Sequence, residues 1–91
     1  MVLSNRAWEH ISERHPEVSY YRELIKDVLA KPELVMKGRL AERKAIRYIE
    51  HTHLGPKYLI VYRERAKQKV IKTAYFTSDL KKTKGEVVWK A

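Results

Sequence analysis

The chain has 91 residues, no cysteine and a net charge of +9, from 20 Lys and Arg side chains against 11 Asp and Glu. This length fits a single domain over residues 1–91, and the lack of cysteine excludes disulfides, thiolate catalysis and cysteine-ligated zinc. The first residues contain no apolar core of a signal peptide, and no apolar run reaches the length of a membrane span. We therefore expect a cytoplasmic protein without membrane contact.

The positive charge is concentrated in the C-terminal part of the chain. Residues 1–35 carry five basic and six acidic side chains, whereas residues 36–91 carry 15 basic and five acidic ones. A charge asymmetry of this kind is typical of a surface that binds a polyanion. RNA is the partner that we expect. Surface lysine that serves only solubility is the alternative.

Two amphipathic helices are predicted at the start of the chain, over about residues 4–15 and 19–30. Ser4 suits the N-cap of the first helix, and Pro16 disfavours helical geometry at the residue before it. The apolar stripe of this helix contains Trp8 and Ile11, with His15 on the same side. The second helix has the clearer apolar period, at Tyr21, Leu24, Ile25, Val28 and Leu29, and Lys31-Pro32 ends it.

Five short runs with strand character follow, over about residues 33–36, 44–51, 57–64, 69–76 and 86–90. They are rich in aromatic and β-branched residues and are separated by turn signals. Residues 77–84 are expected to form a polar, lysine-rich loop. This order predicts an α+β fold in which two N-terminal helices pack on one face of a four- to five-stranded antiparallel sheet.

The first helix has a second, polar stripe formed by Arg6, His10 and Arg14, which recur every four residues. A histidine can transfer a proton near neutral pH, and an arginine can hold a phosphate with two hydrogen bonds. A solvated helix face without function is the alternative. His10 and His15 lie on different faces of the helix, so they can form an acid–base pair only if the helix ends before His15.

Two hydroxyl-bearing residues lie in line on the strand predicted over residues 69–76. Thr73 and Tyr75 share a face with Ile71, and Arg63 belongs to the neighbouring strand. Hydroxyls and arginines that converge on a sheet face can bind phosphate, and a tyrosine can stack on a base. The alternative is that threonine and tyrosine stand here only because both favour strands.

Other kinds of site have little support in the sequence. His51 and His53 could contribute two nitrogen ligands to a metal, but Glu50 points to the other face of the strand. The three glycines are scattered and form no phosphate loop, and no carboxylate pair suggests glycosidase or two-metal chemistry. We expect no metal site and no cofactor.

Three motifs stand out along the chain: His10-Ile11-x-x-Arg14-His15-Pro16-Glu17 in the first helix, Val70-Ile71-Lys72-Thr73-Ala74-Tyr75 in a strand, and the closing Val88-Trp89-Lys90. Together with the amphipathic second helix, they resemble the barnase–EndoU–colicin–RelE-like superfamily, in particular its small phage and mobile-element members. The resemblance spans roughly residues 10–90. It implies N-terminal helices followed by a four-stranded antiparallel sheet.

The resemblance also implies a metal-independent endoribonuclease in which the RNA 2′-hydroxyl attacks the adjacent phosphorus. Its catalytic candidates are His10, Arg14, His15, Thr73 and Tyr75. The basic residues expected to contact RNA are Arg6, Arg47, Arg63, Lys72, Lys81 and Lys82. A toxin–antitoxin or phage-related role would add an acidic antitoxin or immunity protein as a partner. The alternative function is a non-catalytic RNA-binding module that uses the basic, tyrosine-bearing sheet.

Overall fold

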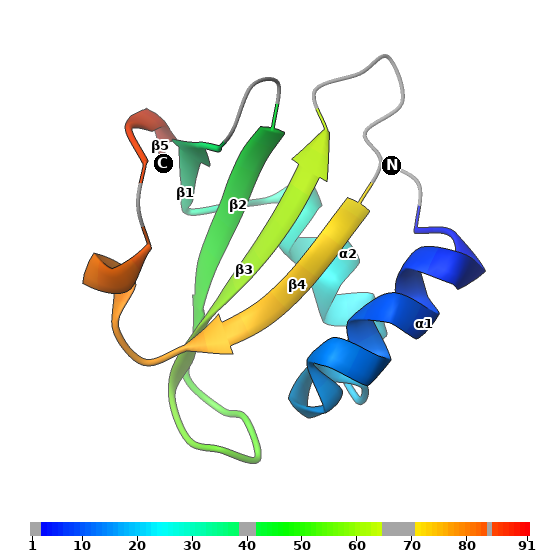
Figure 1. Ribbon diagram of the computed structural model, residues 1–91. Helices are drawn as coiled ribbons and strands as arrows, with labels where there is room; N and C mark the ends of the chain where they lie inside the picture. The colour runs from blue at the N-terminus through cyan, green and yellow to red at the C-terminus, as the bar shows by residue number, and fades with distance from the viewer. Residues whose placement is uncertain (1–2, 39–41, 65–70, 84) are drawn as a thin grey trace.

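Two helices precede a five-stranded antiparallel sheet, which is the predicted α+β arrangement (Figure 1). The computed structural model describes residues 3–38, 42–64, 71–83 and 85–91, without the side chains of Glu64 and Lys82. Its elements are α1 (Asn5–Arg14), the 3₁₀ turn η1 (Pro16–Val18), α2 (Arg22–Ala30), β1 (Leu34–Lys37), β2 (Glu42–Ile49), β3 (Lys57–Glu64), β4 (Ile71–Thr77), the 3₁₀ turn η2 (Leu80–Lys82) and β5 (Val87–Lys90). No described helix is both long and apolar enough to cross a membrane.

Local sequence signals set the ends of the helices. The Ser4 hydroxyl accepts a hydrogen bond from the Ala7 amide at 3.1 Å, as its N-cap role predicts. α1 ends at Arg14, because Pro16 disfavours helical geometry at the residue before it, and His15 has φ −134° and ψ 69°, outside the helical region. The second helix was predicted from residue 19, but α2 begins only at Arg22.

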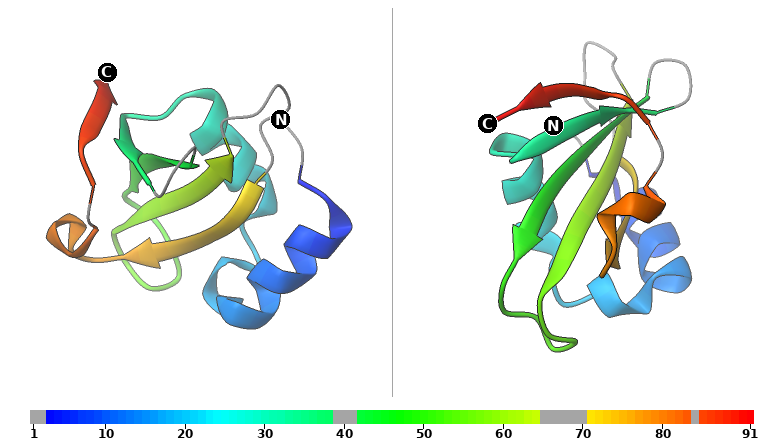
Figure 2. Two further views of the ribbon diagram at one scale, coloured as in Figure 1. Left: turned by 45° about the horizontal axis from the view of Figure 1, so that its top comes forward. Right: turned by 90° about the vertical axis from the view of Figure 1, so that its left-hand side faces the viewer.

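The strand order in the sheet is β4-β3-β2-β1-β5, so β4 and β5 form opposite edges (Figure 2). The consecutive strands β1 and β2, β2 and β3, and β3 and β4 pair with one another, and β5 pairs with β1. The chain then crosses the sheet between β4 and β5, through η2. Residues 77–84 were predicted as a polar loop, but Leu80 of η2 packs against buried side chains of the sheet.

Strand ends differ from the predicted ones by one or two residues. β3 spans the predicted residues, β1 shifts by one residue at both ends, and β5 begins one residue later than predicted. β2 begins two residues earlier and stops at Ile49, where Glu50 starts a bend instead of continuing the strand. β4 is described from Ile71 on, so the predicted strand residues 69 and 70 lie outside the described residues.

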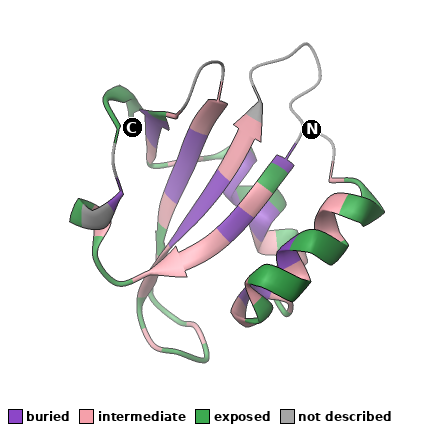
Figure 3. Ribbon diagram, viewed as in Figure 1, coloured by how far each residue is buried: buried purple, intermediate pink, exposed green. Residues whose placement is uncertain are grey.

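The two faces of the sheet carry two separate apolar clusters. The larger cluster joins α1, α2 and the sheet, through residues such as Ile11, Ile25 and Leu59, all with 0% exposure. The smaller one, on the opposite face, consists of Met36, Ile46 and Ile60 with partly buried tyrosines around it. We call the face opposite α2 the outer face. Figure 3 shows how burial concentrates in the central strands.

One predicted face assignment is wrong. Ile71 was expected beside Thr73 and Tyr75, but it is buried in the helix-side cluster. The register between β3 and β4 shifts between Tyr62 and Arg63, so that Ile71 pairs with Arg63 while Thr73 pairs with Tyr62. Because a bulge adds one residue to one strand, side chains beyond it change face.

Candidate functional site

A row of polar side chains crosses the outer face at the end nearest the start of β4. Lys44 lies opposite Tyr62 on the neighbouring strand, and Tyr62 lies opposite Thr73. The Lys44 side chain is largely buried, since the residue is 8% exposed, and its amine lies 5.2 Å from the centre of the Tyr62 ring. This arrangement stabilises a cation beside an aromatic face in a partly desolvated position.

Tyr75 joins this row to the end of α1. Its hydroxyl lies 3.4 Å from the Tyr62 hydroxyl, and its ring centre lies 5.4 Å from the His15 ring centre. Thr83, which is 8% exposed, comes from the segment after η2 and also interacts with the Tyr75 hydroxyl. We call His15, Lys44, Tyr62, Thr73, Tyr75 and Thr83 the outer-face cluster. It draws on α1, three strands and the crossover.

The environment of Tyr75 keeps its hydroxyl protonated. Burial raises the pKa of Tyr75 to about 12, and the hydrogen bond with Tyr62 acts in the same direction. The positive charge of Lys44 and the hydrogen bond with Thr83 oppose this shift without reversing it. At neutral pH Tyr75 is therefore a hydrogen-bond donor beside a cation, a combination suited to an anionic oxygen.

His15 reaches the outer face because α1 ends before it. Its Nδ1 lies 3.7 Å from the Glu17 carboxylate, and its side chain remains 33% exposed. A carboxylate beside one ring nitrogen orients the ring. The condition set by the sequence is met, since the helix stops at Arg14 and His15 is free of the helical geometry that separated it from His10.

His10 and Arg14 are exposed on one flank of α1. Trp8 marks the flank nearer α2, because the Arg22 guanidinium lies 5.5 Å from the centre of its ring. With about 100° per residue, His10 and Arg14 fall on the other flank, and both are exposed. α1 itself lies beside the β4 edge of the sheet (Figure 1). The two residues are available to a ligand that extends over that edge.

The predicted convergence of Arg63 with Thr73 and Tyr75 is wrong. Arg63 pairs with Arg43 across β2 and β3, and both line a cavity on the helix side of the sheet. The cause is the alternation of strand residues, since Arg63 directly follows the outward-facing Tyr62.

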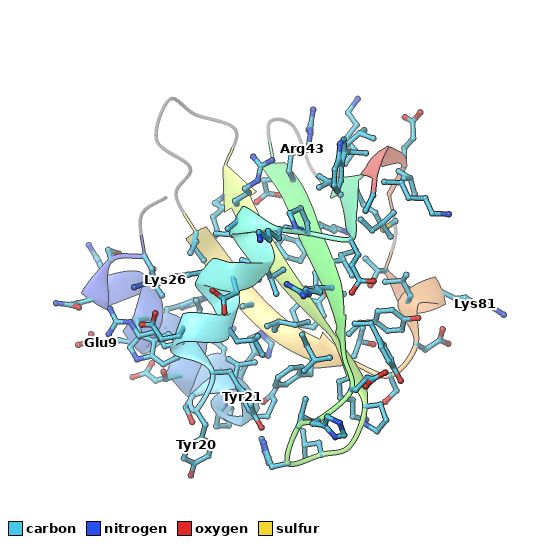
Figure 4. The ribbon with its side chains drawn as sticks, turned by 180° about the vertical axis from the view of Figure 1, so that it is seen from behind. Glu9, Tyr20, Tyr21, Lys26, Arg43 and Lys81 are labelled. Carbon is cyan, nitrogen blue, oxygen red and sulfur yellow. The ribbon has the colours of Figure 1, made fainter. Side chains whose placement is uncertain are left out.

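The remaining basic residues predicted to contact RNA are scattered. Lys72 binds the Glu42 carboxylate at 3.0 Å, and the Arg47 guanidinium lies 4.0 Å from the Glu33 carboxylate. Arg6 is exposed on α1, and Figure 4 shows Lys81 pointing away from the protein. The side chain of Lys82 lies outside the described residues. The structure therefore joins three of the predicted site residues, His15, Thr73 and Tyr75, and separates the basic ones.

Neither histidine after β2 belongs to a metal site in the part of the chain that the structure describes. His51 lies 3.9 Å from the Glu50 carboxylate, and the Nδ1 of His53 lies 2.8 Å from the Tyr21 hydroxyl. Among the described residues, no group of three or more His, Cys, Asp or Glu side chains is placed to hold a metal ion.

Sequence reasoning missed three members of the outer-face cluster: Lys44, Tyr62 and Thr83. The signal for Lys44 was present, because it alternates with Ile46 and Tyr48 and therefore shares their face. Thr83 carried no such signal, since only the crossover through η2 brings it to the sheet.

Comparison with known proteins adds no relative, because the chain matches no family model, no curated protein and no solved structure. The resemblance to the superfamily of small ribonucleases rests on the sequence motifs.

Proposed function

We propose that this protein is a metal-independent endoribonuclease whose active site is the outer-face cluster together with His10 and Arg14. The observation that supports this most is the hydroxyl of Tyr75, which stays protonated beside the Lys44 amine and the His15 ring. A proton-transfer group, neutral donors and a cation are what phosphodiester cleavage by an internal nucleophile requires.

In the proposed reaction, one histidine removes the proton of the RNA 2′-hydroxyl as its oxygen attacks the adjacent phosphorus. The bond from phosphorus to the 5′-oxygen breaks, and the second histidine gives a proton to that leaving oxygen. His15 and His10 fill these two roles. The products are a 2′,3′-cyclic phosphate and a free 5′-hydroxyl. DNA lacks the nucleophile and is spared.

The other residues of the site act on the phosphate oxygens. Lys44 and Arg14 offset the negative charge that develops there, and the Tyr75 and Thr73 hydroxyls donate hydrogen bonds to the same oxygens. Because the Lys44 amine is held against the Tyr62 ring, it is positioned before the substrate arrives. A cytoplasmic location and a toxin–antitoxin or phage-related role belong to the same proposal.

The test uses purified protein, a labelled single-stranded RNA and the matching DNA, all in EDTA. The wild type is expected to cleave only the RNA and to leave a 2′,3′-cyclic phosphate. His15→Ala and His10→Ala are each expected to slow cleavage by about 10²–10⁴-fold, the usual contribution of a positioned proton donor or acceptor. His51→Ala is the matched control, because His51 is a histidine with a 96% exposed side chain beyond the end of β2.

Each other outcome argues against the proposal in a defined way. RNA that is retained but not cut would favour the non-catalytic RNA-binding module, for which the outward tyrosines supply stacking surfaces. If His51→Ala and His15→Ala slow RNA cleavage equally, the outer-face cluster is not the active site. If the protein neither cleaves nor binds RNA, its positive charge serves only solubility.

A further inference from the structure

A groove on the helix side of the sheet is separate from the outer-face cluster. It has a volume of about 640 Å³ and lies between the C-terminal end of α2 and β5. Its lining combines cations, at Lys31, Arg43 and Arg63, with apolar side chains at Val35, Val88 and Trp89. We call it the β5 groove. Figure 4 shows Arg43 at this end of the sheet, beside α2.

The strand beside this groove is an exposed, apolar sheet edge. Within the described residues β5 pairs with β1 on one side and with no strand on the other, so that other side forms an edge of the sheet. All four of its residues are exposed, including Val87 at 48%, Val88 at 46% and Trp89 at 49%. Proteins usually protect such an edge, and an edge of this kind accepts a strand from another chain.

The charge of the groove selects among the possible occupants. A second copy that paired through β5 would bring together two chains that each carry a net charge of +9. A nucleic acid would bind the cations, but it would not pair with the backbone edge of β5 or cover its valine side chains. A strand with acidic and apolar side chains matches the cations, the apolar lining and the backbone edge together.

We propose that the β5 groove binds an extended, acidic segment of a partner protein, which adds to the sheet as a sixth strand beside β5. Backbone hydrogen bonds to β5 supply the register, and apolar side chains of the segment pack against Trp89 and Val88. Its carboxylates reach Arg43 and Lys31. This goes beyond the proposed ribonuclease, because the partner occupies the face opposite the outer-face cluster and leaves that cluster open.

The probe is an eight-residue synthetic peptide with the repeat Glu-Glu-Val-Val, so that each face of the extended strand carries both glutamate and valine. It is titrated into the full chain and followed by NMR. We expect saturable shifts of the Val87–Lys90 amides and of the Trp89 indole. A peptide with lysine in place of glutamate should not bind. A third peptide, N-methylated along one edge, keeps the side chains but cannot pair with a strand, and it should bind at least about tenfold more weakly.

Two charge reversals locate the site. Arg43→Glu should weaken binding of the acidic peptide by about tenfold or more, because it places a carboxylate in the groove. Lys26→Glu, on the exposed side of α2, makes the same charge change elsewhere and should leave the affinity unaltered. Circular dichroism of both variants checks that each is folded.

Four results would overturn the proposal: no binding at millimolar peptide, shifts confined to other residues, equal binding of the N-methylated peptide, or equal binding of the lysine peptide. Dimerisation through β5 in sedimentation would assign the edge to a second copy. If poly-uridylate displaces the peptide and shifts the same resonances, the β5 edge binds RNA instead of a protein segment. None of these readouts involves RNA cleavage, so failure here leaves the proposed ribonuclease unaffected.

Discussion

Tyr75 keeps its proton because the sheet and the crossover surround its hydroxyl with protein. In an exposed strand the same tyrosine would titrate near pH ~10. Burial, followed by the Tyr62 hydrogen bond, raises its pKa to about 12, and the neighbouring Lys44 charge is too weak an opposing effect to prevent this. Tyr75 therefore stays a hydrogen-bond donor to higher pH than an exposed tyrosine.

This pKa predicts a specific dependence of stability on pH. The unfolded chain releases the Tyr75 proton near pH ~10, before the folded protein does at about 12. The stability contributed by the neutral hydroxyl is therefore full below about pH 10 and is lost as pH rises through about 12. Tyr75→Phe removes this contribution. The difference in unfolding free energy between wild type and variant should shrink over this interval.

Urea unfolding of the two proteins at a series of pH values measures that difference. The tyrosines and lysines that do not interact with Tyr75 are in the same surroundings in both proteins, so their titration cancels. A difference that stays constant through the interval would show that Tyr75 titrates normally in the folded protein.

At the scale of single elements, β5 depends on one glycine. Gly85 precedes the strand with φ +140°, and a Cβ added there would meet the backbone carbonyl oxygen of Lys37. The Lys37 amide donates a hydrogen bond to the Glu86 carbonyl at 2.7 Å, so this close approach belongs to the β1–β5 pairing itself. Only glycine fits both the conformation and the contact.

Gly85→Ala should therefore detach β5 from β1 and lower the free energy of unfolding by about 1–3 kcal/mol. Hydrogen exchange should show faster exchange of the Trp89 and Val87 amides, with β3 unchanged. Gly55→Ala is the matched control, because Gly55 also has positive φ, +85°, but its added Cβ meets no atom within 4 Å. If both variants lose the same stability, the contact with Lys37 has no role.

The elements themselves were largely predictable, and the exceptions have physical causes. Ser4, Pro16 and the Lys31-Pro32 pair set the helix ends through capping and through the backbone limits of proline, which are local effects. The face of Ile71 was not predictable, because a bulge opposite Arg63 depends on how two strands pair. An alternation of side chains assumes a regular strand, and that assumption fails at a bulge.

At the scale of the whole molecule, the charge asymmetry seen in the sequence is divided between two surfaces. Lys44 lies on the outer face, whereas Arg43 and Arg63 line the β5 groove on the other side of the same strands. A net charge therefore indicates an anionic partner without saying how many binding surfaces there are. If both proposals hold, RNA on the outer face and an acidic segment in the β5 groove can be bound at once.

The salt dependence of RNA binding tests which lysines belong to the outer surface. For single-stranded nucleic acid, each phosphate contact adds about 0.7 to the slope of log affinity against log salt concentration. Lys44→Met keeps most of the side-chain volume and removes the charge, so the slope should become shallower by about 0.7. Fluorescence anisotropy of a labelled RNA at several salt concentrations measures it.

Lys26→Met is the control, because Lys26 lies on α2, on the side of the molecule shown in Figure 4. Its slope should equal that of the wild type. An unchanged slope in the Lys44 variant would mean that Lys44 serves only the packing of Tyr62 and makes no phosphate contact.

The sequence by itself determined the features that depend on residues close together in the chain. These are the α+β class, the two helices, the existence of the strands, and the excess of positive charge after residue 35. It also singled out His15, Thr73 and Tyr75 one by one, because each residue type carries its own chemistry.

Only the tertiary structure decided which of these residues meet. The contact of His15 with Tyr75 requires α1 to end at the edge of the sheet. The interaction of Thr83 with Tyr75 requires the crossover through η2. The separation of Arg63 from Thr73 and Tyr75 depends on how β3 and β4 pair. Each depends on pairing between distant segments, and local propensities do not encode such pairing, because burial of the two apolar clusters selects it.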